Sequence, residues 1–243
     1  MVSDEKNISV STRCFGVSFA IAFPTVLTAG YFILFAGSDL QQAVYGVGKV
    51  IQFGFPAAWA YFALREKVTW PRWNSRGVTT GLAFGAAILL VMMVLYNFVL
   101  APAGVFDQAN EKILAKIGEM GVATTWKFIA LGTFYALVHS LMEEYYWRWF
   151  VFRQLRELMN AKWAIFISSV GFMSHHVILL SVFFGWTHWA TYFFSVCVAV
   201  GGVAWSWLYN RSESLYGPWF SHLLVDTAIF TIGFQIVRHT FSS

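Results

Sequence analysis

The chain has 243 residues, of which 58% are hydrophobic, 19% aromatic and only 12% charged, and its mean hydropathy is +0.60. Soluble domains have about 25% charged residues, so the composition excludes an ordinary soluble or disordered protein and predicts a membrane protein. The net charge of +4 does not indicate nucleic-acid binding, because the 16 basic residues are spread among apolar runs.

A helix that crosses a bilayer needs about 20 mostly apolar residues. Seven segments meet this requirement in chain order: residues 13–36, 42–64, 78–100, 124–152, 163–183, 188–209 and 217–238. We therefore expect an all-α fold, a polytopic transmembrane helical bundle of about seven to eight spans that forms one domain over residues 1–243. The first span follows Met1 without an Ala-x-Ala cleavage site, so we interpret it as a retained anchor.

Two features interrupt this series of spans. Residues 101–123 contain Ile113, Leu114 and Ile117 among charged residues, a spacing that predicts a short amphipathic helix at the membrane surface. The fourth segment is unusually long, and charged residues occupy its second half. Cys14 and Cys197 fall in apolar runs, so neither a disulfide framework nor a cysteine-based zinc site is expected.

Basic residues in the links predict the orientation, because they favour the cytoplasmic side. Ten of them fall on one side: Lys6, Arg13, Arg65, Lys67, Arg72, Arg76, Arg153, Arg156, Lys162 and Arg211. Three fall on the other: Lys112, Lys116 and Arg238. We expect a cytoplasmic N-terminus and an outer C-terminus, and the short loops favour a prokaryotic plasma membrane.

Ionisable groups within spans are costly and are therefore candidates for function. Glu144 and Arg148 stand four residues apart, so they can form an ion pair on one helix face, whereas Glu143 is rotated about 100° away. We interpret Glu143 as a general base or acid and the pair as its electrostatic scaffold. Two glutamates near a membrane surface could instead serve topology alone.

Histidines in two later spans complete the candidate site. Phe172 and His176 share a helix face, and His175 is expected to point elsewhere. His188 repeats the spacing after Phe184 but belongs at the outer boundary, so we interpret it as a decoy.

In the last span His222 and Asp226 lie four residues apart, so the carboxylate can hydrogen-bond one ring nitrogen of His222. A structural His–Asp clamp is the alternative. Glu143, His176 and His222 all lie roughly 15 to 21 Å along their helices from the basic loops, so they can share one polar layer.

These residues resemble the CPBP family of intramembrane proteases, also called the Abi or type II CAAX-protease family, which includes the Rce1-type prenyl endopeptidases. The motifs that carry the resemblance are Glu143-Glu144-x-x-x-Arg148, Phe172-x-x-x-His176 and His222-x-x-x-Asp226, in the family order within residues 124–238. Residues 1–123 match nothing that we can assign. Asp226 stands where Rce1-type members carry Asn, so we expect it to orient His222 or to lie near a cation.

The resemblance implies an intramembrane endopeptidase that cleaves a membrane-associated, prenylated or lipid-anchored peptide or protein, with membrane lipids as its other partners. Glu143 and His176 would activate water, and His222 with Asp226 would stabilise the oxyanion or assist a metal. No cofactor is certain; Glu143, His176 and His222 are a possible zinc set.

Three other functions remain open. A transporter or proton relay would also place Glu, His and Asp within spans, although no internal repeat is present. A haem protein could use His176 and His222 as axial ligands. An inactive relative could serve as a binding scaffold.

Overall fold

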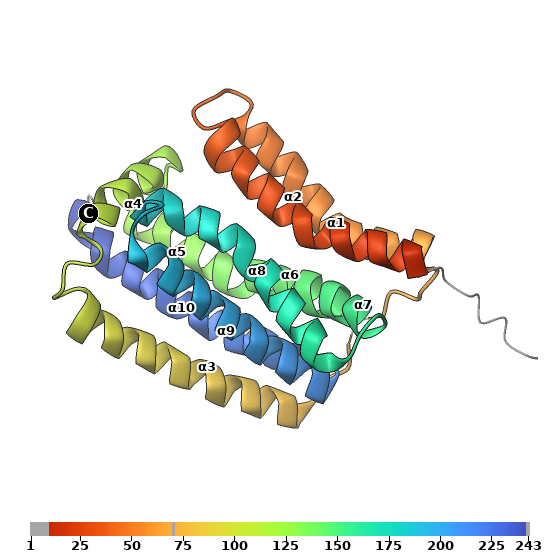
Figure 1. Ribbon diagram of the computed structural model, residues 1–243. Helices are drawn as coiled ribbons and strands as arrows, with labels where there is room; N and C mark the ends of the chain where they lie inside the picture. Colours follow the sequence, from red (N-terminus) through yellow and green to blue (C-terminus); the bar gives the residue numbers. More distant parts are fainter. Residues whose placement is uncertain (1–9, 70, 242–243) are drawn as a thin grey trace, which may run out of the picture.

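The computed structural model describes residues 10–69 and 71–241, and within these ranges the regular structure is entirely helical (Figure 1). Lys6, one of the basic residues used to predict the orientation, lies outside the described residues. The all-α, polytopic fold expected from the composition is confirmed.

The first half of the chain forms a helical hairpin, one long helix and one short helix. The hairpin consists of α1 (Val10–Ala29) with the π-helical turn η1 (Gly30–Leu34), and α2 (Gln41–Ala58) with η2 (Trp59–Ala63). Helix α3 (Ser75–Leu95) continues as η3 (Tyr96–Leu100), and α4 (Asp107–Glu119) follows.

The second half begins with one long helical segment built from five consecutive pieces. These are α5 (Thr125–Phe134), η4 (Tyr135–His139), α6 (Ser140–Glu144), η5 (Tyr145–Phe152) and α7 (Arg153–Arg156). Three long helices and a short 3-10 turn complete the chain: α8 (Ala161–Phe184), α9 (Trp189–Ser212), α10 (Tyr216–Val237) and η6 (Arg238–Thr240).

Among the described residues, five helices are long and apolar enough to cross a membrane: Val10–Leu34, Ser75–Leu100, Ala161–Phe184, Trp189–Ser212 and Tyr216–Thr240. The two other expected spans, 42–64 and 124–152, are helical over most of their length but too polar to qualify. Lys49 and Gln52 make the former more polar, and Glu143, Glu144 and Arg148 do the same in the latter. The sequence-based number of seven therefore exceeds the five that qualify by length and composition.

The long segments run side by side, with α3 along one edge and the α1–α2 hairpin along the opposite one (Figure 1). The links after η2, α7 and α9 all lie at the same end of the bundle, on the right in Figure 1. These are the basic loops, so the expectation that they share one side is met. Their assignment to the cytoplasm stays a prediction.

The segment of α6 and η5 lies at the centre of the bundle. Every residue from Tyr146 to Phe152 is buried, because α1, α2, α8 and α9 surround this stretch. Tyr146 donates a hydrogen bond of 2.7 Å to the carbonyl of Ala20 on α1. π-helical turns flank α6 on both sides, a feature that often accompanies functional sites.

Helices α3 and α10 pack with their backbones in contact. A Cβ atom added to Gly85 would lie 2.8 Å from the Cα of Ser221, and one added to Gly81 would overlap the carbonyl of Gly217. Only glycine permits this approach.

The expected amphipathic helix is confirmed as α4, but its apolar side packs on the bundle end. Ala109 and Ile117 are buried there, the latter beside Phe128 and Val237.

Candidate active site

Three helices bring the candidate residues together inside the bundle. Helix α6 supplies Glu143 and Glu144, α8 supplies His175 and His176, and α10 supplies His222 and Asp226. Glu143, Glu144 and His222 are 5%, 0% and 4% exposed. Ionisable groups buried this deeply must find partners within the protein, and their partners define the site.

Glu144 is the centre of a buried ion network. Its Oε1 lies 3.1 Å from a guanidinium nitrogen of Arg148, as the i, i+4 spacing predicted, and it accepts a hydrogen bond of 2.8 Å from Nδ1 of His222. The guanidinium carbon of Arg148 lies 4.9 Å from the ring centre of Phe172 and 5.2 Å from that of Trp205. The hydrogen bond from His222 therefore links α10 to α6, and the ion pair with Arg148 links α6 to η5 of the same helical segment.

Glu143 faces a ring of imidazoles. Its carboxylate oxygens lie 3.7 Å from Nε2 of His222, 3.9 Å from Nε2 of His175 and 4.0 Å from Nδ1 of His139. Glu143 has no arginine or lysine nitrogen within 4.0 Å among the described residues, as its position on the helix predicted. These gaps are longer than a hydrogen bond, so a small polar molecule could be contacted by the carboxylate and the rings together.

The prediction that His175 points elsewhere is wrong. The residue is 8% exposed, and its ring stacks parallel to Trp147 at 6.0 Å and lies 4.2 Å from the ring of His176. Adjacent helical residues differ by 100° in direction, yet ligand atoms of both histidines and of Glu143 lie within 4.8 Å of one another. The His-His dipeptide in an apolar span was the signal that could have identified it.

The tautomer of His176 is fixed by the backbone. Its Nδ1 donates to the carbonyl of Phe172 over 2.9 Å, and the two rings lie 4.8 Å apart. A neutral ring then keeps its lone pair on Nε2, which is the arrangement found in histidines that act as bases or bind metals. Phe172 thus serves both as the acceptor and as packing for the ring.

Glu144, and not Asp226, orients His222. The sequence predicted a hydrogen bond from Asp226, but Oδ1 of Asp226 lies 3.6 Å from Nε2 of His222, beyond hydrogen-bond distance, while Glu144 holds Nδ1. The ring of His222 also stacks on Trp205 at 4.0 Å, a contact from α9 that no sequence spacing indicated. Nε2 of His222 is left facing Glu143 and Asp226.

The group that could hold a metal ion differs from the expected one. Ligand atoms of Glu143, His175 and His176 all lie within 4.8 Å of one another, whereas the sequence suggested Glu143, His176 and His222. Two imidazoles and a carboxylate are a donor set that suits zinc, and the Phe172 carbonyl on Nδ1 of His176 is a typical outer partner of a ligating histidine. The residues present therefore fit such an ion.

Lys49 of α2 belongs to the surroundings of the site and does not extend to a helix end. Its ammonium lies 5.3 Å from the ring centres of both Tyr45 and Phe53, and Phe53 contacts His139 at 6.2 Å. Lys49 and Glu143 interact electrostatically. Lys49 therefore places a basic side chain from α2 beside the histidines that surround Glu143.

His188 lies at the far end of α8, as expected for a decoy. It caps α9, where its Nδ1 accepts a hydrogen bond of 3.2 Å from the backbone of Ala190. Lys127 donates to the carbonyl of Gly121 near the start of α5. Neither residue contacts the site.

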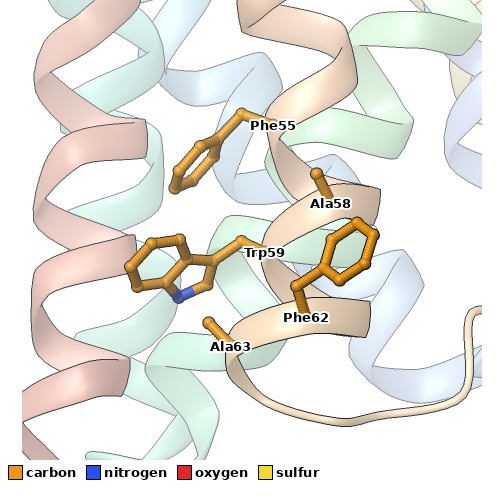
Figure 2. A pocket seen from close by; sticks show the side chains of 5 residues that line it. All are labelled: Phe55, Ala58, Trp59, Phe62 and Ala63. Atoms are coloured by element: carbon orange, nitrogen blue, oxygen red, sulfur yellow. The ribbon is translucent and has the colours of Figure 1, made fainter.

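An apolar hollow lies on α2 and η2, away from the charged residues. Its volume is about 350 Å³, and Figure 2 shows its lining residues: Phe55, Ala58, Trp59, Phe62 and Ala63. None of these can donate or accept a proton in catalysis. Phe55 packs against Phe150 of η5 at 5.7 Å, which connects the hollow to the helix that carries Glu143.

Comparison with known proteins identifies the part of the chain that contains the site. No curated protein and no solved structure matches the chain. Residues 125–228, which include all six candidate residues predicted from the three motifs, match the family model described as type II CAAX prenyl endopeptidase Rce1-like. The segment from α5 into α10 is therefore similar to the Rce1-like family of type II CAAX prenyl endopeptidases.

Proposed function

We propose that the protein is an intramembrane endopeptidase that hydrolyses a peptide bond in a membrane-associated, prenylated or lipid-anchored substrate. The observation that carries the proposal is the buried Glu143 carboxylate, which lies within 4.0 Å of three imidazoles. The family match supports the same chemistry and does not favour a transporter, a proton relay or a haem protein. No serine or cysteine nucleophile is needed.

Glu143 acts as the general base in this proposal. It takes a proton from a water molecule whose oxygen adds to the scissile carbonyl carbon, while His175 and His176 position that water. The same proton then passes to the amine leaving group as the carbon–nitrogen bond breaks. Glu143 therefore ends the cycle ionised, as it began.

His222 stabilises the oxyanion. When its ring carries protons on both nitrogens, Nδ1 stays bonded to Glu144 and Nε2 is free to donate to the developing negative charge. Asp226 lies 3.6 Å from Nε2 and balances that charge between turnovers. Arg148 does not reach the substrate, because Phe172 and Trp205 enclose its guanidinium.

A metal-dependent version uses the same residues. Glu143, His175 and His176 would hold a zinc-like ion, which would supply Lewis-acid polarisation of the carbonyl and an acidified water. His222 keeps its place as oxyanion donor in either version.

The apolar hollow on α2 and η2 supports a lipid-modified substrate. Its lining is aromatic and aliphatic, it lies on the end of α2 and on η2, directly before one of the basic loops, and Phe55 connects it to the central helix. We place that end, and the entry to the site, on the cytoplasmic face of a prokaryotic plasma membrane.

Turnover by purified protein tests the proposal. The full chain is reconstituted in liposomes with prenylated and unmodified peptides, and product is measured for the original protein, Glu143→Gln, His176→Gln and His188→Asn. The first two substitutions should reduce kcat by at least about 100-fold, and His188→Asn should leave it nearly unchanged because Asn can still cap α9. Cleavage that persists in Glu143→Gln would exclude the mechanism.

A further inference from the structure

A cavity of about 520 Å³ lies at the basic end of the bundle, between the start of α3 and the end of α9. It is separate from the site around Glu143. The residues that line it are Asn74, Arg76, Gly77, Thr80, Trp207, Leu208, Arg211 and Ser212. Arg76, Arg211 and Trp207 have N–H groups that can donate hydrogen bonds to a negatively charged group. The hydroxyls of Thr80 and Ser212 already donate to the carbonyls of Arg76 and Leu208.

The lining carries two positive charges and no negative one. Neither Arg76 nor Arg211 has a carboxylate oxygen within 4.0 Å in residues 10–69 and 71–241. The guanidinium of Arg211 lies 5.7 Å from the ring centre of Trp207, which holds it along the α9 wall. Two uncompensated guanidinium groups beside one cavity favour an anion with several oxygens, such as a phosphate.

The floor of the cavity is rigid. Asn74 accepts a hydrogen bond of 2.8 Å from the backbone of Gly77 and donates one of 3.1 Å to the carbonyl of Ser212. A Cβ atom on Gly77 would lie 2.8 Å from the Cβ of Ser212, so α3 and α9 are in close contact below the cavity. The cavity is thus part of the packed fold and does not depend on a loop.

The position of the cavity indicates the kind of anion. Arg76 lies in the first turn of the membrane-spanning helix Ser75–Leu100, and Arg211 lies in the last turn of Trp189–Ser212. Phospholipid phosphates occupy this level of a bilayer, and basic cavities between helices at the cytoplasmic side suit anionic headgroups. Trp207, which is 45% exposed, adds the amphipathic ring typical of that interface.

We propose that this cavity binds the headgroup of an anionic phospholipid, with the phosphate between Arg76 and Arg211 and an acyl chain along Trp207. A soluble anion would use only the two arginines. A lipid also uses the apolar wall formed by Trp207 and Leu208, and it is held at the correct depth by the bilayer.

Lipid retention by the full chain tests the proposal. Protein purified from nanodiscs that contain phosphatidylcholine and phosphatidylglycerol is examined by native mass spectrometry, and phosphatidylglycerol affinity is obtained by titration. The original chain should retain phosphatidylglycerol in preference to phosphatidylcholine. Arg76→Gln/Arg211→Gln should weaken the phosphatidylglycerol affinity by about 30-fold, since each basic residue near the surface contributes about 1 kcal/mol.

A matched control distinguishes the effect of the cavity arginines on lipid affinity from the effect of surface charge in general. Arg72→Gln/Arg156→Gln removes two exposed charges at the same end of the bundle and should leave the affinity unchanged. Thr80→Phe keeps both arginines but fills the cavity, and it should lower the affinity as the arginine variant does. This variant also tests the proposal if the double arginine variant does not fold.

Three outcomes would overturn the proposal. They are equal retention of the two lipids, equal losses in the two double variants, and displacement of phosphatidylglycerol by inorganic phosphate at matched concentration. The last would identify a site for free phosphate instead. Because binding is measured without turnover, these outcomes are independent of whether the protein is an endopeptidase.

Discussion

His222 donates a hydrogen bond of 2.8 Å from Nδ1 to Oε1 of Glu144, and the same oxygen lies 3.1 Å from Arg148. Glu144 therefore fixes the orientation of the ring of His222, which is 78 residues away in sequence. Nε2 of His222 is therefore left facing Glu143, the proposed general base.

Glu144→Gln should lower both stability and activity. The loss of its charge leaves Arg148 buried without a counter-ion, which costs about 3–5 kcal/mol, and the weaker hold on His222 should reduce kcat by about 10–100-fold. Unfolding in detergent micelles and peptide turnover measure the two effects. The exposed Glu157→Gln is the control, and full stability of Glu144→Gln would contradict the network.

Removal of both charges should restore stability without activity. Glu144→Leu/Arg148→Met eliminates the buried ion pair and leaves no unpaired charge, so most of the lost unfolding free energy should return. His222 would still lack its acceptor, and turnover should stay low. If the double variant is as unstable as the single one, the pair is not what stabilises this region.

Asp226→Asn should have a small effect. Its carboxylate lies 3.6 Å from His222 and does not hydrogen-bond the ring, and its side chain is 14% exposed. An amide can occupy the same space and keep an oxygen facing Nε2, so kcat should stay within about tenfold of the original value. Asp226→Leu, which cannot accept, should lose more. A loss in Asp226→Asn as large as that in Glu143→Gln would mean that Asp226 itself carries a proton in the reaction.

Metal analysis distinguishes two ligand sets. If the protein holds a zinc-like ion, His175→Gln and His176→Gln should lower the affinity for the metal, whereas His222→Gln should keep the metal and lose turnover. Bound metal is measured directly on purified protein, and a competing chelator gives the affinity. Loss of metal in His222→Gln with retention in His175→Gln would favour the set suggested by the sequence.

The contact between α3 and α10 predicts the effect of one methyl group. Gly81→Ala would place a Cβ atom against the Gly217 carbonyl and should destabilise the fold by about 1–3 kcal/mol. Gly54→Ala is the control: it has open space around it within 4 Å, and alanine favours a helix by about 0.5–1 kcal/mol over glycine. Equal thermal stability of the two variants would contradict the close approach.

The structural features that depend on residue spacing within one helix could be predicted from the sequence. Apolar runs identified the helices, and the i, i+4 rule identified the pair of Glu144 with Arg148, because both depend on local geometry. The amphipathic spacing of Ile113, Leu114 and Ile117 likewise predicted α4. Residues 42–64 and 124–152 are helical as expected, but they carry polar residues, so five of the seven expected spans qualify by length and composition among the described residues.

Relationships between helices could not be predicted in the same way. The bond from His222 to Glu144, the stacking of Trp205 on His222 and the approach of His175 to Glu143 depend on how α6, α8, α9 and α10 are rotated against one another. Helical periodicity indicates which residues share a face but not which partner that face meets. The assignment of Asp226 as the orienting residue failed for this reason, since a nearer acceptor came from another helix.

The glycine contacts between α3 and α10 restrict how a substrate can reach Glu143. An extended polypeptide is about 5 Å thick, and the two backbones already touch at Gly81, Gly85 and Gly217. A peptide that enters laterally from the bilayer cannot pass between α3 and α10 unless these helices separate. The route of entry must therefore follow a different helix boundary, and cross-linking can test the boundary with α2, whose Lys49 interacts electrostatically with Glu143.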